Sequence, residues 1–211
     1  MNMSRTISSV LFLLVMAAIA AVGIVYLRSY SGTEVKPAVS TSAAADIVMY
    51  RQDDEKWASE KLGGSEYTMK SSGCLVSCIA SALTMQGAEQ TPGTLNRIFS
   101  ENNVYDSEGN ILWDKIDAFD FHFARVYDDV SSEDIDKCLS DGDYPIVKVR
   151  RNGNGSFHYV LIAGTENGEY VCMDPLEDEL MLLSDYGDTV YSVRCVGIEK
   201  ISADTESNTL N

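Results

Sequence analysis

Basic residues and histidines are scarce in this chain of 211 residues. It has 16 Lys and Arg against 32 Asp and Glu, which gives a formal net charge of −16, and only 2 His. The whole acidic excess lies within residues 46–201, the part that we expect to fold. Such a surface repels phosphate backbones and anionic lipid, so we expect no nucleic-acid partner. It is compatible with basic peptide substrates, although acidic residues more commonly serve solubility.

Motifs of several common enzyme classes are also absent. The chain has no phosphate-binding loop, no dinucleotide fingerprint and no Gly-x-Ser-x-Gly elbow. Cys74 and Cys78, even with His158, form a weak zinc motif because no second Cys pair accompanies them. The acidic run at residues 174–179 lacks the alternating ligands and the glycine of a calcium loop. We therefore expect no metal and no other cofactor.

One long apolar run lies near the N-terminus. Residues 6–27 carry no charge, and residues 10–26 are apolar throughout. A membrane span requires about 20 apolar residues. The small residues Ala18 and Ala20 would suit a signal peptidase, but apolar residues continue beyond them. The sequence thus predicts an uncleaved, single-pass signal anchor at residues 1–28 with the body outside the cytoplasm; a cleaved signal peptide and a secreted protein are the alternative.

The remaining chain reads as one domain of the α+β class. Residues 29–46 are small and polar and predict a flexible linker, residues 47–201 form the domain, and residues 202–211 form a polar tail. Caps and apolar periodicity predict helices beginning at Cys74, Pro92, Trp113 and near Ser131. Alternation and turn residues then predict strands at residues 145–150, 157–163, 170–173 and 190–198. Helices followed by an antiparallel sheet define the α+β class.

Cys74 is the candidate nucleophile. It follows Gly73 at the start of the predicted helix, where first-turn N–H groups and the helix dipole stabilise a negative charge. His158 lies in a predicted strand, and Asp174 closes the next one. If a hairpin at residues 166–168 joins these strands, the two side chains are cross-strand neighbours within hydrogen-bond reach. Asp174 would then orient His158 as the base for the thiol, whereas His122 is expected to be a partly buried strand residue.

Three stretches in this order resemble the C39-like cysteine peptidases, a branch of the papain-like fold related to bacteriocin-processing peptidases. They are Gln52-Asp53-Asp54-Glu55-Lys56-Trp57, Ser72-Gly73-Cys74, and His158-Tyr159-Val160 with Asp174-Pro175. The resemblance covers about residues 48–199 and implies a papain-like fold and a peptide or protein substrate. It also implies that Cys74 attacks the scissile carbonyl, that His158 acts as base and then acid, and that Asp174 orients it. Gln52 and the backbone N–H of Cys74 would bind the oxyanion, and Trp57 would be a packing anchor.

The chain departs from the family pattern directly after the nucleophile. Many relatives have a small residue, proline and threonine there, but this chain has Leu75-Val76-Ser77-Cys78. We expect Cys78 to be a buried helix residue; the alternative is that it pairs with Cys74 or resolves its oxidised form. Because the chain has five cysteines, at least one is unpaired if the others pair within the chain.

Two other functions fit the same residues. One is a non-catalytic peptide-binding or structural module on this fold, and the other is acyl transfer to an amine rather than to water. The oligomeric state does not follow from the sequence.

Overall fold

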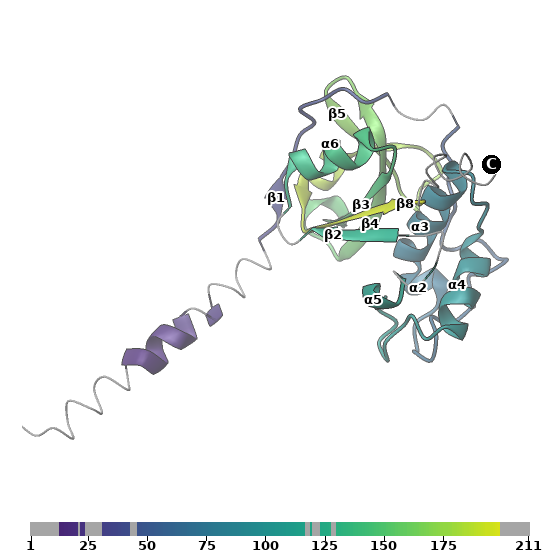
Figure 1. Cartoon of the computed structure of the whole chain (residues 1–211), viewed down its shortest axis with the longest axis horizontal. Helices are drawn as coiled ribbons and strands as arrows, with labels where there is room; N and C mark the ends of the chain where they lie inside the picture. Colours follow the sequence, from purple (N-terminus) through teal and green to yellow (C-terminus); the bar gives the residue numbers. More distant parts are fainter. Residues whose placement is uncertain are drawn as a thin grey trace, which may run out of the picture.

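The computed structural model describes residues 13–20, 22–23, 31–42, 46–116, 119, 123–127 and 130–198, with residues 123–127 described for the backbone only. It is an α+β structure in which helices precede an antiparallel sheet, as the sequence predicts (Figure 1). The helices are α2 (Met69–Ser72), α3 (Cys74–Met85), α4 (Pro92–Glu101), α5 (Trp113–Ile116) and α6 (Ser132–Ser140). The strands are β1 (Thr33–Glu34), β2 (Phe123–Tyr127), β3 (Tyr144–Arg150), β4 (Phe157–Glu166), β5 (Glu169–Met173), β6 (Met181–Leu182), β7 (Thr189–Val190) and β8 (Ser192–Gly197), with short 3-10 turns η1 (Arg151–Gly153) and η2 (Leu183–Tyr186).

The main sheet has six strands in the order β2-β8-β3-β4-β5-β6, and every neighbouring pair is antiparallel. Successive side chains of a strand point to opposite faces. Ile146 of β3 accordingly joins the core cluster that contains α3, while Val147 joins a second cluster that contains Ile135 of α6. The sheet therefore lies between α3 on one face and α6 on the other (Figure 1).

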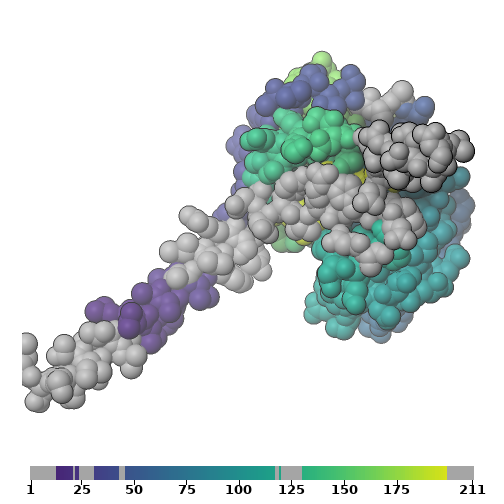
Figure 2. Space-filling model, in the orientation of Figure 1, coloured from purple at the N-terminus to yellow at the C-terminus, as the bar shows by residue number. Residues whose placement is uncertain are grey.

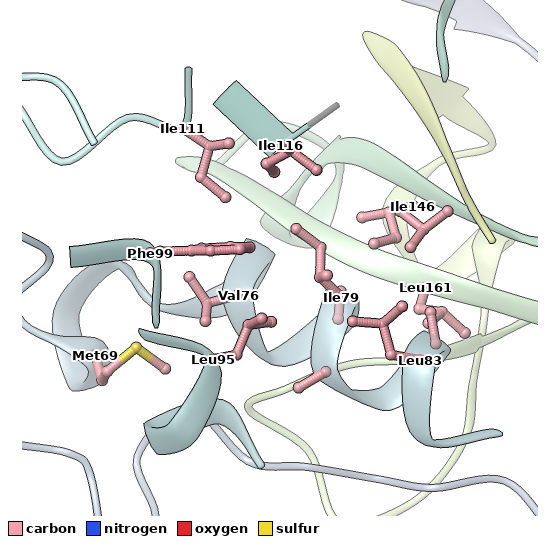
Figure 3. Close-up of a cluster of buried hydrophobic side chains, with 14 of the residues drawn as sticks. Met69, Val76, Ile79, Leu83, Leu95, Phe99, Ile111, Ile116, Ile146 and Leu161 are labelled. Atoms are coloured by element: carbon pink, nitrogen blue, oxygen red, sulfur yellow. The ribbon is translucent and has the colours of Figure 1, made fainter. Parts of the chain in front are cut away.

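Helix α3 is the central helix of the first half. Every residue from position 76 to position 83 is buried, which is typical of a helix surrounded by other elements. Figure 3 shows its side chains Val76, Ile79 and Leu83 among those of α4 and the sheet. At its C-terminal end the side chain of Gln86 donates to the carbonyl of Val196 at 3.0 Å and accepts from the N–H of Ile198 at 2.7 Å. These two bonds attach α3 to the end of β8.

The predicted helix starts are confirmed. Thr91 and Ser131 cap α4 and α6 with their side chains, each accepting from a backbone N–H three residues later. The predicted final strand is divided into β7 and β8, and the predicted loop at residues 185–188 includes part of the 3-10 turn η2. His122 lies outside the described residues, so its expected place in a strand stays a prediction.

A disulfide joins Cys138 of α6 to Cys195 of β8. It holds α6 against the face of the sheet that is remote from α3. The other three cysteines are free: Cys74 is half-buried, and Cys78 and Cys172 are buried. The prediction that Cys78 is a buried helix residue is confirmed.

Residues 31–42, within the stretch expected to be a flexible linker, are attached to the second half of the chain. β1 pairs with β7, and Val35 is 1% exposed. The backbone N–H groups of Ala38 and Val39 donate to the buried carboxylate of Asp136 in α6 at 2.9 and 3.2 Å. In Figure 2 the blue atoms of this segment lie beside the green atoms of α6. A few backbone hydrogen bonds and one apolar side chain thus dock a stretch whose composition suggests disorder.

The prediction that the apolar N-terminal stretch spans a membrane is contradicted. Residues 13–20 and 22–23 are helical, and none of the helices in the described part of the chain is long and apolar enough to cross a membrane. A bilayer requires about 20 such residues in one helix. The prediction of a single-pass membrane anchor, and the membrane localisation that depended on it, is therefore wrong.

Candidate active site

Cys74 is the first residue of α3, as the sequence predicts. The preceding Gly73 is the N-cap, and a Cβ atom at this position would lie 2.5 Å from the carbonyl oxygen of Met69. Only glycine therefore lets α2 and α3 meet this closely. The first N–H groups of an α-helix have no partner within the helix, and Gly73 has no side chain to cap them. The half-buried thiol of Cys74 consequently lies at the positive end of the helix dipole.

His158 and Asp174 form a buried pair. The Nε2 atom of His158 lies 2.7 Å from Oδ1 of Asp174, and the two residues are 4% and 2% exposed. The predicted hydrogen-bond reach between them is confirmed. Because Asp174 occupies Nε2, the other ring nitrogen, Nδ1, is the one left for Cys74.

The register that brings this pair together differs from the predicted one. Direct opposition of His158 and Asp174 requires a turn centred at residue 166. The observed turn is Asn167-Gly168, both with positive φ, and a β-bulge shifts the pairing between Ile162 and Gly164. Asp174, one residue beyond β5, is thus displaced by two positions along β4. The imidazole spans this diagonal because diagonal neighbours remain within reach of large side chains.

Tyr186 is a member of the site that sequence reasoning missed. Its hydroxyl donates to Oδ2 of Asp174 at 2.5 Å, and the N–H of Leu176 donates to Oδ1 at 2.8 Å. Burial alone raises the pKa of Asp174, but hydrogen bonds from His158, Tyr186 and Leu176 outweigh burial and hold this pKa below its ordinary value of 3.8. Asp174 is therefore kept as an anion that orients the imidazole.

The surroundings of His158 favour its charged form. Burial lowers the pKa of His158, whereas hydrogen bonds with Asp174 and Cys74 and their charges raise it, and together they bring it to about 9. At pH 7 the ring is then mostly an imidazolium beside the sulfur of Cys74. This is the charge state of His158 that a thiolate–imidazolium pair requires.

Gln52 bonds to the chain on both sides of the site, near Asp174 and shortly before Cys74. Its backbone N–H donates to the carbonyl of Pro175 at 3.0 Å, and its Nε2 donates to the carbonyl of Lys70 at 2.7 Å. A side-chain amide has two N–H donors, so one remains for another acceptor. The role of Gln52 as an oxyanion donor stays a prediction. Trp57 is 6% exposed and donates to the carbonyl of Arg51 at 2.8 Å, which confirms it as a packing anchor.

A cleft of about 480 Å³ opens at Cys74. The start of α3, at residues 74–76, forms one wall. The remaining lining residues come from the loop at residues 108–111 and from Leu62, Tyr67, Ser72, Trp113, Tyr159 and Arg194. Cys74 is therefore accessible to a ligand of peptide size, whereas His158 and Asp174 are buried and do not line the cleft.

No group of three or more His, Cys, Asp or Glu residues that would hold a metal ion occurs within the described ranges. The expectation that the protein works without a cofactor stays a prediction. In comparisons with known proteins, the chain matches no family model, and no curated protein matches it. The resemblance to C39-like peptidases consequently depends on the residues of the site alone.

Proposed function

We propose that this protein is a cysteine peptidase with a papain-like fold, similar to the C39-like peptidases, and that it hydrolyses peptide bonds through Cys74, His158 and Asp174. The observation that carries the proposal is the buried His158–Asp174 pair, 2.7 Å apart, beside a thiol at a helix start. The cleft that opens at this thiol gives a peptide access to it. A histidine that contacts both a carboxylate and a thiol is more typical of a catalytic site than of a purely structural role.

The chemistry follows from the charges of His158 and Asp174 and from the place of Cys74 at the start of α3. The Cys74 thiolate attacks the scissile carbonyl carbon, and the oxygen takes up the negative charge. The N–H of Cys74 stabilises this oxyanion, and the free N–H of Gln52 is the second donor in the proposal; one such donor is typically worth about 3 kcal/mol in the transition state. His158 donates its proton to the leaving amine, which departs and leaves a thioester on Cys74.

Water completes the cycle. His158, now neutral, takes a proton from a water molecule that attacks the thioester carbonyl. The carbon–sulfur bond then breaks, which restores the Cys74 thiolate beside the His158 imidazolium, and the carboxylic acid product leaves and releases its proton to the solvent. Asp174, held by Tyr186 and Leu176, keeps the ring in one orientation during both proton transfers.

A labelling and cleavage experiment on the full chain tests the proposal. Iodoacetamide and an epoxide probe should modify Cys74, and a peptide library should yield cleavage products that are lost in Cys74→Ala. Cys172→Ala is the matched control, since Cys172 is free but buried, and it should retain both labelling and cleavage. Equal labelling of Cys74→Ala would refute the proposal. Labelling without any cleavage would favour a peptide-binding module, and products extended by an added amine would favour acyl transfer.

A further inference from the structure

Arg194 of β8 lies in the same cleft as Cys74. Its neighbours Val193 and Cys195 belong to the opposite face of the sheet, where Val193 packs in the second core cluster and Cys195 is bonded to α6. Val196, two residues beyond Arg194, packs in the cluster of α3. Strand alternation therefore directs Arg194 towards the α3 side and into the cleft.

The charge of Arg194 has no counter-ion among the residues that the structure describes. Its Nη1 donates to the carbonyl of Val193 at 2.9 Å, and its buried Nε has no acceptor. In contrast, Arg51 binds two carboxylates, those of Asp53 at 2.9 Å and Asp178 at 2.6 Å.

Trp113 holds the guanidinium in place. The Cζ atom of Arg194 lies 5.0 Å from the centre of the Trp113 ring, within the range of a cation–π contact. Burial lowers the pKa of Arg194, and among the described residues the nearby Tyr159 opposes this effect. A guanidinium remains protonated in proteins, so the cleft contains a positioned, incompletely compensated positive charge. An incoming carboxylate would supply the missing counter-ion.

We propose that Arg194 is the carboxylate-binding residue of this cleft and that it selects peptides with an acidic group, either an Asp or Glu side chain or a terminal carboxylate. The proposal rests on the proposed function, because the carboxylate would position a peptide against Cys74. The planar guanidinium suits the two oxygens of a carboxylate. Glu108, the acidic residue among the described lining residues, is exposed on the 108–111 loop. The acidic group of the peptide should therefore bind at the Trp113 and Arg194 side of the cleft.

Reagents that alkylate Cys74 provide the test, because they need no known substrate. The thiolate displaces iodide from an iodoacetyl group, so the rate at Cys74, measured by mass spectrometry, reports binding near the thiol. N-iodoacetyl-glutamate α-amide is compared with its glutamine twin, and N-iodoacetyl-leucine with its leucinamide twin. Each reagent is made with zero to three glycines after the iodoacetyl group, so that one length spans the cleft. The first pair reports a side-chain carboxylate, and the second reports a terminal carboxylate.

We expect one acidic reagent to label Cys74 at least about tenfold faster than its neutral twin. A hydrogen bond to a charged group contributes about 1.5–3 kcal/mol, and 1.4 kcal/mol is a factor of ten. Arg194→Gln should abolish this ratio. Arg97→Gln, which removes the same charge from an exposed position on α4, should keep it. A ratio near one at every length, or a ratio that survives Arg194→Gln, would overturn the proposal.

Two further measurements keep this test separate from the test of the peptidase. If Arg194→Gln does not fold, Arg194→Lys is used instead. It retains the charge but lacks the planar guanidinium with its paired N–H donors, so it should reduce the ratio of the two labelling rates. If Cys74 does not react, the peptidase proposal fails, and binding of acetyl-Gly-Gly-Glu-amide and acetyl-Gly-Gly-Gln-amide to Cys74→Ala is measured by titration calorimetry. Tighter binding of the acidic peptide, lost on Arg194→Gln, supports the carboxylate site without turnover. Equal or absent binding of both peptides overturns it.

Discussion

Removing the Tyr186 hydroxyl should weaken both the fold and the site. In Tyr186→Phe the ring remains, but Oδ2 of Asp174 loses a donor at 2.5 Å. Both residues are buried, at 5% and 2% exposed, so water does not replace the lost donor readily. A hydrogen bond to a charged group contributes about 1.5–3 kcal/mol, and we expect a loss of about 2 kcal/mol in the free energy of unfolding. With a urea slope of about 1–3 kcal/mol per M, the midpoint should fall by roughly 1 M.

The pH dependence of this variant has a definite sign. The pKa of Asp174 is depressed in the fold, so its stabilising contribution is present above its unfolded value of about 3.9 and is lost as pH falls through the folded value. Without the Tyr186 donor this folded pKa rises, and acid unfolding should begin at a higher pH. The measurement is urea unfolding between pH 3 and pH 7, with Tyr191→Phe as the matched control. If the two variants were equally stable over that range, the argument that Tyr186 supports Asp174 would be refuted.

Three further predictions concern the rest of the site and its support. Because the pKa of His158 is raised to about 9, its stabilising contribution should be complete below about pH 6.5 and disappear as pH rises through 9; urea unfolding from pH 6 to pH 10 should show this decline, and His158→Gln should not. Gln52→Ala should lower kcat by about 10²–10³ if the amide binds the oxyanion, whereas a purely structural role would lower the unfolding midpoint and leave kcat of the folded protein unchanged. Replacing Cys138 and Cys195 by serine should lower the free energy of unfolding by about 4 kcal/mol, as the entropy of a loop with a sequence separation of 57 implies, and an unchanged melting temperature would contradict this.

The features that local chemistry determines were predictable from the sequence. Caps, prolines and glycines mark the helix starts, and the position of Cys74 follows from one of them. The pairing of His158 with Asp174 was also predictable, because a hairpin joins two strands that are close in sequence. Its register was not, since the turn lies at Asn167-Gly168 instead of being centred on residue 166, and the bulge between Ile162 and Gly164 corrects only part of this difference. The two residues still pair because the imidazole of His158 reaches Asp174 across the diagonal between the strands.

Features that depend on contacts distant in sequence were missed. Tyr186 reaches Asp174 from a 3-10 turn that reads as an ordinary loop. Arg194 did carry a signal, because it is the one charged residue in the strand β8, whose neighbouring residues from position 193 to position 196 are buried and apolar. The prediction of a membrane anchor depended on the hydropathy of residues 6–27, whereas no helix in the described part of the chain is long and apolar enough to cross a membrane. Val35 is one of two valines in a stretch of mostly small and polar residues, and it was too weak a signal for a docked segment.

The net charge of the protein and Arg194 in the cleft favour substrate groups of opposite charge. A formal charge of −16 attracts basic peptides from a distance, while Arg194 would bind an acidic group at the site. Salt separates these effects, because the field of exposed charges is screened beyond about 10 Å at 0.1 M ionic strength, whereas a partly buried pair is screened much less. Added salt should therefore reduce the advantage of basic flanking residues but preserve most of the preference for a carboxylate at Arg194. The best substrate would accordingly combine an acidic residue at the cleft with basic residues on either side.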